Sequence, residues 1–252
     1  MRDGRTARTP PLYIKRMVSA GADATTAQRP DFDMFRIFGP PGTGKTTTLL
    51  DMVDKSLEEG IHPHKIAFLA FTRKAAHEAR DRAAKRFDLD PKEDLPFFRT
   101  LHSLALAQSD IRVDQIMQPE DYRELGDQIG HSFASGGSTE TASFSDRIQT
   151  NDPVLGLINL ARLRKVQLRD QYNISNIDMD WMLVSFISRA LKVYKEKRNR
   201  YDFTDMLEYF SKTADRYCPQ FEVTFLDEAQ DLSPLQWDIA HALDRKSKKM
   251  YV

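Results

Sequence analysis

Residues 39–47 read GPPGTGKTT and directly follow the apolar run MFRIF at residues 34–38. This stretch matches the pattern G-x-x-x-x-G-K-[ST], which forms a phosphate-binding loop where a strand opens onto a helix. Glycines let the backbone bend so that consecutive N–H groups face a phosphate, and a helix from Lys45 adds its positive N-terminal dipole. The predicted nucleotide-binding residues are Gly39, Pro40, Pro41, Gly42, Thr43, Gly44, Lys45, Thr46 and Thr47. A glycine-rich turn without a ligand is the structural alternative.

A second segment, FEVTFLDEAQD at residues 221–231, has the character needed to complete such a site. Its apolar first half is typical of a strand buried in a parallel sheet, and Asp227 and Glu228 follow at the carboxyl end, where ligands bind in open α/β sheets. We predict that Asp227 holds Mg²⁺ together with Thr46, and that Glu228 orients and deprotonates the attacking water. A solvated acidic turn before a helix starting near Ser233 is a compatible alternative.

Five segments in the same order resemble the UvrD/Rep-like DNA helicases of superfamily 1. They are the phosphate loop, KIAFLAFTRKAAHEARDR (65–82), FFRTLHSLA (97–105), YDFTDML (201–207) and the acidic segment. The resemblance implies an α/β fold of the P-loop NTPase (RecA-like) type, a parallel sheet with an inserted helical subdomain. It also implies ATP and Mg²⁺ as ligands, and ATP hydrolysis that drives movement along single-stranded DNA and unwinding at duplex junctions, in DNA repair or replication.

The same resemblance implies roles for further residues. Gln230 would sense the γ-phosphate and join Lys45, Asp227 and Glu228 as a catalytic residue. The implied DNA contacts are Phe71, Thr72, Arg73, Thr100 and His102. Several of these positions have structural alternatives, because Phe71 could be a core aromatic, Thr72 a plain helix N-cap and His102 a structural histidine.

Outside these motifs, other polar and aromatic residues have competing interpretations. Asp202 and Asp205 could support the acidic segment, although Asp202 is favoured as a helix N-cap. The basic stretch LKVYKEKRNR (191–200) is either a solvated helix face or a nucleic-acid contact. Trp181 and Trp237 occur in apolar helical patterns and are predicted to be core residues.

The distance between the loop lysine and the acidic pair is too large for a minimal nucleotide-binding unit, and an inserted subdomain accounts for it. We predict a flexible or loosely packed lead-in, a RecA-like domain and a helical insertion, at residues 1–31, 32–108 with 201–252, and 109–200. Apolar residues recur at helical spacing in 119–129, 153–168, 179–197 and 202–216. Residues 131–145 are rich in Ser, Gly and Thr and read as a surface loop.

Composition is that of a soluble protein with a proper core. Hydrophobic residues make up 40% of the 252 positions, and no run approaches a membrane helix. Lys plus Arg equals Asp plus Glu at 37 each, so net charge neither favours nor excludes nucleic acid. A single cysteine, Cys218, and the absence of a secretory h-region predict a reducing, cytoplasmic location, in a bacterial or phage-infected cell or on its nucleoid.

Two features depart from the family pattern. The expected adenine-contacting glutamine motif is not recognisable, and Gln28 lacks its flanking residues. The chain also ends at Val252, before the second RecA-like domain, so we expect it to bind Mg-nucleotide weakly, hydrolyse it slowly at best and unwind nothing. A helicase-like ATPase subunit of a recombination nuclease and a nucleotide-binding module without turnover are the alternative functions.

Overall fold

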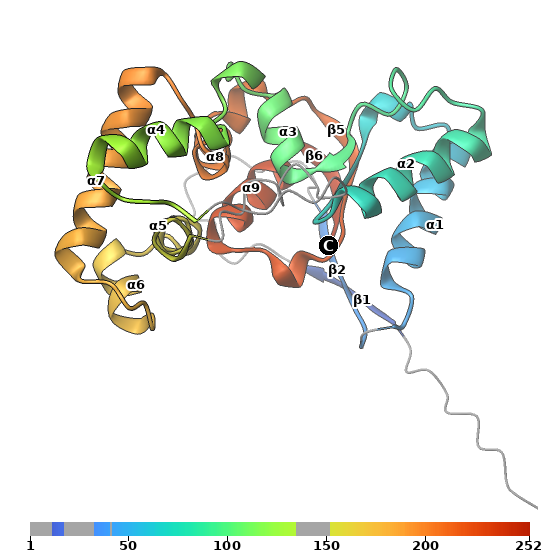
Figure 1. The fold of residues 1–252 in the computed structure, drawn as a ribbon. Coiled ribbons are helices and arrows are strands. Elements are labelled where there is room, and N and C mark those ends of the chain that lie inside the picture. The colour runs from blue at the N-terminus through green and yellow to red at the C-terminus, as the bar shows by residue number, and fades with distance from the viewer. Residues whose placement is uncertain (1–11, 18–32, 41, 135–151) are drawn as a thin grey trace, which may run out of the picture. The chain divides into compact units, whose positions relative to one another are not determined.

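The computed structural model describes residues 12–17, 33–40, 42–134 and 152–252 (Figure 1). The described residues belong to two compact units. The first comprises Met1–Thr100, Pro219–Asp231 and Leu243–Val252, and the second comprises Leu101–Cys218 and Leu232–Ala242. No helix in the described part of the chain is both long and apolar enough to cross a membrane.

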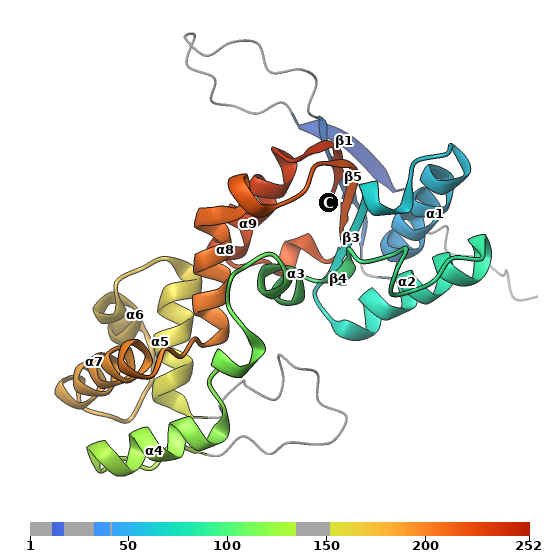
Figure 2. The ribbon, with the colours of Figure 1, turned by 90° about the horizontal axis from the view of Figure 1, so that it is seen from above.

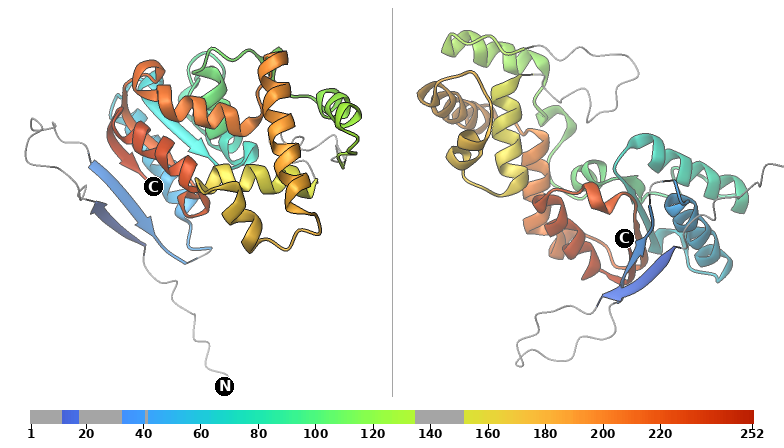
Figure 3. Two further views of the ribbon diagram at one scale, coloured as in Figure 1. Left: turned by 90° about the vertical axis from the view of Figure 1, so that its left-hand side faces the viewer. Right: turned by 90° about the horizontal axis from the view of Figure 1, so that it is seen from below.

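The first unit is built on a sheet that, within the described residues, has the strand order β1-β2-β6-β5-β3-β4. All neighbouring strands are parallel except β1 and β2, which are antiparallel and lie side by side as the blue arrows of Figure 3. The strands are β1 (Tyr13–Met17), β2 (Asp33–Phe38), β3 (Ile66–Ala70), β4 (Phe98–Thr100), β5 (Phe221–Leu226) and β6 (Ser247–Tyr251). The predicted fold class, an α/β protein with a mainly parallel sheet, is confirmed.

A row of aromatic rings crosses this sheet and fixes the register of its strands. Phe35, Tyr251, Phe225, Phe68 and Phe98 occupy paired positions on five consecutive strands. Successive ring centroids are 5.1, 5.5, 6.5 and 6.0 Å apart. Aromatic pairs at such distances stabilise cross-strand pairing beyond the area that they bury. A shift of one residue in any strand would turn its ring to the opposite face.

Two helices cover one face of the sheet, α1 (Lys45–Glu58) and α2 (Arg73–Phe87), and Figure 2 shows both on the same side. Their apolar stripes pack on β3 and β5 in one core cluster. Asp54 of α1 is 2% exposed and accepts hydrogen bonds from Arg82 at 2.8 Å and from Arg86 at 2.5 Å, both on α2. A buried carboxylate requires such partners, so these ion pairs fix α1 against α2.

The second unit is helical in its described part. Its main core is formed by α4, α5 and α7, and α5 (yellow) lies against α7 (orange) in Figure 3. The helices are α3 (Leu101–Ala107), α4 (Pro119–Ile129), α5 (Pro153–Arg164), α6 (Leu168–Ile174), α7 (Trp181–Arg198), α8 (Phe203–Tyr217) and α9 (Pro234–Asp244). Asp152, Asp180 and Asp202 cap α5, α7 and α8 by accepting backbone N–H bonds, which confirms the predicted N-cap role of Asp202.

The unit boundaries differ from those expected from sequence. Helices α3 and α8, and α9 as far as Ala242, belong to the helical unit, although 101–108 and 201–252 were expected in the RecA-like domain. The physical reason is that α8 packs against α3, and its Met206 joins Ile111 and Ile116 in a small core cluster. Within the expected lead-in, Tyr13–Met17 form a strand paired with β2, and the side chains of residues 13–16 are exposed. Residues 1–11 and 18–31, and most of the predicted loop at 131–145, lie outside the described residues.

Candidate nucleotide-binding site

The phosphate loop connects β2 to α1, and its backbone requires glycine at two positions and leaves little room for a side chain at a third. Gly42 and Gly44 have φ angles of 77° and 82°, in the left-handed region that other residues rarely adopt. Gly39 is restricted by space, because a Cβ atom there would lie 2.5 Å from Thr43 Oγ1 and 2.6 Å from Leu12 Cδ2. The loop conformation therefore depends on the glycines that the sequence pattern selected; Pro41 is outside the described residues.

Helix α1 begins without the groups that normally satisfy a helix N-terminus. Its N-cap is Gly44, no side chain of the described residues caps it, and its first turn contains no acidic residue. The first backbone N–H groups of a helix have no intrahelical partner, and the helix dipole places positive charge there. A phosphate bound in the loop would supply both the missing acceptors and the negative charge.

The side chain of Lys45 lies across the loop. Its Nζ donates to the carbonyl oxygens of Gly39 at 2.9 Å and Pro40 at 3.4 Å, and Thr43 Oγ1 also donates to Pro40, at 2.8 Å. Lys45 makes no ion pair within the part of the chain that the structure describes. Its charge is therefore available to a phosphate, and neutral carbonyls hold the ammonium group in place. Thr47 is exposed on the first turn of α1.

The acidic segment meets the phosphate loop through one pair of side chains. Asp227 follows β5 and is 4% exposed, and its backbone N–H donates to Leu69 on β3 at 2.8 Å. Thr46 Oγ1 lies 3.2 and 3.1 Å from the two carboxylate oxygens of Asp227. Burial raises the pKa of Asp227. A hydroxyl and a buried carboxylate this close provide the oxygen ligands that Mg²⁺ prefers, so these residues fit the predicted metal.

Glu228 stands beside this pair in an unusual backbone conformation. Its side chain is exposed and its φ angle is 55°, a left-handed value that costs a non-glycine residue about 1–2 kcal/mol. The Gln230 amide donates to the Glu228 carboxylate and, at 3.4 Å, to Asp231. The structure thus brings the predicted base and the predicted sensor into direct contact. Strained backbone of this kind is concentrated at functional sites.

The predicted DNA contacts differ in exposure. Phe71, directly after β3, is 49% exposed and is not a core residue. Thr72 caps α2 by accepting a hydrogen bond from the Ala75 N–H at 3.2 Å, and Arg73 follows with an exposed side chain. Thr100, at the end of β4, is buried. The segment 71–73 therefore offers a ring, a hydroxyl and a cation at the carboxyl edge of the sheet.

His102 lies in α3 of the second unit and is half-buried. Its ring meets that of Phe203 edge-on, with centroids 6.0 Å apart. Burial lowers the pKa of His102 to about 4. The imidazole is therefore neutral at physiological pH and does not offer a positive charge to DNA.

We expect His102 to make stability depend on pH. Because its pKa is 6.5 when exposed and about 4 in the fold, stability is full above pH 6.5 and falls as the pH approaches 4. The loss from this group reaches about 3 kcal/mol at 1.36 kcal/mol per pKa unit. Urea denaturation of His102→Gln should show a shallower decline than wild type, whereas exposed His64→Gln should not. If the free energy of unfolding falls equally with pH in wild type and in His102→Gln, the lowered pKa of His102 is not the cause of the pH dependence.

Other residues singled out in the sequence have structural roles. Trp181 packs against the main core of the second unit, with the Arg169 guanidinium 4.5 Å from its ring, and Trp237 is half-buried. Asp202 and Asp205 bind Arg162 and Lys195 of the second unit, not the acidic segment. The sequence did not identify Arg162 and Lys195 as partners of these aspartates, because nothing in the spacing of the two cations marks them. The Asp-x-x-Asp capping pattern at 202–205 was the signal available for this cluster.

A parallel sheet whose glycine loop and acidic strand meet at Thr46 and Asp227 defines a P-loop NTPase domain of the RecA-like type. The chain belongs to the UvrD/REP helicase N-terminal domain family, whose model matches residues 23–252. It is similar to the ATP-dependent DNA helicase PcrA of Leuconostoc citreum, with 27% identity over 236 residues, 86% of this chain and 30% of that protein. The chain thus spans less than a third of the length of this curated relative.

Proposed function

We propose that this chain is the ATP-binding part of an ATP-dependent DNA helicase, which couples ATP hydrolysis to movement along single-stranded DNA and to duplex unwinding. The observation that carries the proposal is the Thr46–Asp227 contact beside the uncapped N-terminus of α1. Family membership and the similarity to PcrA support it. Single-stranded DNA and duplex junctions are the proposed partners, and the cytoplasm the proposed location.

In the proposed mechanism, the chain's own residues bind and orient the triphosphate. Backbone N–H groups of the loop and of the first turn of α1 hold the phosphate oxygens, and Lys45 neutralises β/γ charge. Thr46 and Asp227 would hold Mg²⁺, which would supply neutralisation of the charge on the triphosphate. Glu228 accepts a proton from the attacking water, and Gln230 holds the Glu228 carboxylate in position.

Strand binding is proposed for the segment that follows β3. Phe71 offers an exposed ring for base stacking, and Arg73 and the α2 N-terminus offer positive charge to a DNA phosphate. Hydrolysis in related P-loop enzymes is accelerated by about 10³–10⁵-fold by an arginine delivered to the transition state. For this family we propose that a second RecA-like domain delivers it, so that unwinding needs both domains.

Replacing Lys45 with Ala should weaken ATP binding by roughly 10- to 100-fold, because a hydrogen bond to a charged group contributes about 1.5–3 kcal/mol. Titration of a fluorescent ATP analogue with the 252-residue chain, in the presence of Mg²⁺, would measure this. Lys55→Ala is the matched control, since Lys55 is on the same helix with its side chain 73% exposed. Equal affinities for wild type and Lys45→Ala, with an unchanged melting temperature, would exclude this loop as the nucleotide site.

A further inference from the structure

The second unit contains a cavity of about 650 Å³, lined by residues of α5, α7 and α8 and of the turn between α7 and α8. Its volume lies within the range of roughly 300–1,000 Å³ that is typical of small-ligand sites. None of the residues proposed above for nucleotide or strand binding lines it. The cavity thus has no part in the function proposed so far.

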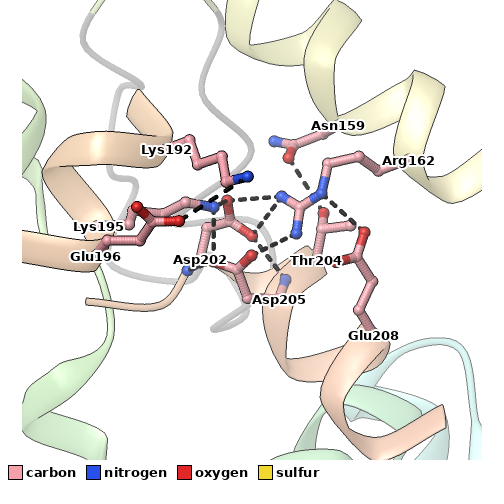
Figure 4. A network of polar contacts seen from close by, with 9 residues as sticks. All are labelled: Asn159, Arg162, Lys192, Lys195, Glu196, Asp202, Thr204, Asp205 and Glu208. Atoms are coloured by element: carbon pink, nitrogen blue, oxygen red, sulfur yellow. Dashed lines mark hydrogen bonds and ion pairs between the residues drawn. The ribbon is translucent and has the colours of Figure 1, made fainter. Parts of the chain in front are cut away.

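The inner wall of the cavity is an ion-pair network (Figure 4). The Arg162 guanidinium contacts Asp202, Asp205 and Glu208 at 2.8, 2.5 and 2.9 Å, and Lys195 Nζ contacts Asp202 and Asp205 at 2.5 and 2.7 Å. These two cations face three carboxylates. The three negative charges outnumber the two positive ones, so the inner wall does not itself attract an anion. It does hold α5, α7 and α8 in fixed positions around the cavity.

The cations on the outer side of the cavity are different. Arg189 and Lys212 are exposed, and neither makes an ion pair within the described residues. Lys192 meets Glu196 only at 4.0 Å, and their side chains are 77% and 64% exposed, so this pair contributes little. Arg189 and Lys212 thus present positive charge that no ion pair of the described residues neutralises, and Lys192 adds a charge that Glu196 offsets only weakly. Such a group attracts a ligand with several negative charges, as successive phosphates have.

Two aromatic side chains complete the lining. Tyr201 and Tyr209 are both half-buried, and both pack on the small core cluster that contains Met206. The Tyr209 hydroxyl donates to Asp110 at 3.1 Å, which fixes the orientation of its ring. Rings fixed beside cations are the combination that binds single-stranded nucleic acid, because bases stack on the rings while phosphates meet the charges.

We propose that this cavity is a second binding site for single-stranded DNA, separate from the segment after β3. Phosphates contact Arg189, Lys192 and Lys212, and a base or sugar packs against Tyr201 and Tyr209. The inference rests on the proposed function, because that proposal supplies single-stranded DNA as the ligand. Within the basic stretch at 191–200 it assigns Lys192 to a nucleic-acid contact, whereas Lys195, Arg198 and Arg200 pair with carboxylates. A free polyphosphate shares the anionic chemistry and is distinguished by the test.

The test measures binding of a fluorescent oligothymidine to the 252-residue chain by anisotropy, over a range of salt concentrations. For a single strand, removing one cation that pairs with a phosphate changes the slope of log K against log salt by about 0.7. The variant Arg189→Glu/Lys212→Glu should therefore bind more weakly, with a slope shallower by about 1.4. The control Arg123→Glu/Lys197→Glu makes the same change in net charge on α4 and α7, outside the cavity. It should retain the wild-type slope.

A second pair of variants examines the stacking contact. Tyr209→Leu should lower affinity without altering the slope, and Tyr209→Phe, which keeps the ring but not its hydrogen bond to Asp110, should bind more tightly than Tyr209→Leu. Equal reductions of affinity in the cavity variant and the control would overturn the proposal, as would an unchanged slope in the cavity variant. If the cavity variant loses binding of tripolyphosphate but binds the oligonucleotide like wild type, the cavity is a site for a free polyphosphate and the strand site is overturned. Failure of wild type to bind the oligonucleotide at all would instead refute the proposed function.

Discussion

Replacing Glu228 with Gln is expected to leave Mg-ATP binding intact and to slow hydrolysis by about 10²–10⁴-fold. The amide keeps the size and the oxygen acceptor of the side chain, so the hydrogen bond from Gln230 is retained, but it cannot take a proton from water. The measurement is phosphate release from radiolabelled ATP under single-turnover conditions, with the chain in excess and single-stranded DNA present. These conditions detect turnover even if the chain alone is slow.

Two further variants separate base chemistry from metal binding. Glu222→Gln is the matched control, because Glu222 is on β5, the strand that leads to Glu228, and forms an ion pair with Lys248 at 2.7 Å. It should hydrolyse ATP like wild type. Asp227→Asn should instead weaken binding only when Mg²⁺ is present, since it removes the buried carboxylate beside Thr46. If Glu228→Gln hydrolyses ATP at the wild-type rate, the general base is another residue.

Much of the nucleotide site could be predicted because its geometry is encoded in a short stretch of chain. The glycines at 42 and 44 determine the loop backbone, and the loop leads into α1 at Lys45, the residue predicted to start it. The second half of the site required a long-range inference. It succeeded because a buried apolar run followed by Asp227 and Glu228 is typical of a parallel strand ending at a ligand site.

The limits of prediction follow from tertiary contacts that local patterns do not encode. Helix α8 was predicted closely, as 202–216 against Phe203–Tyr217, yet its unit was not, because its partner α3 is about a hundred residues away in sequence. The antiparallel strand β1 was missed, since a short basic segment beside prolines carries little strand signal. Exposure at Phe71 also needed the structure, because an aromatic ring after a strand is equally consistent with a core position.

The ion-pair network of the second unit should make Arg162→Met the most destabilising single change considered for that unit. Arg162 binds three carboxylates, and Asp202 among them is buried with its side chain 4% exposed. Burial lowers the pKa of Arg162, but attraction by Asp202, Glu208 and Asp205 outweighs it, so the pKa is raised. Methionine keeps the aliphatic stem and removes the charge. Removing one partner of a buried network costs about 3–5 kcal/mol.

Urea denaturation followed by tryptophan fluorescence would measure this destabilisation, because Trp181 and Trp237 both belong to the second unit. The control is Arg123→Met, whose ion pair with Glu120 is 2.7 Å long but about 70% exposed on both sides and should contribute less than about 1 kcal/mol. Adding Asp205→Asn to Arg162→Met should recover part of the stability. Burial, followed by repulsion from Asp202, raises the pKa of Asp205, so neutralising it relieves the charge that Arg162 no longer balances. A destabilisation by Arg162→Met no larger than that by Arg123→Met would mean that water compensates these carboxylates and that the network does not hold the helices together.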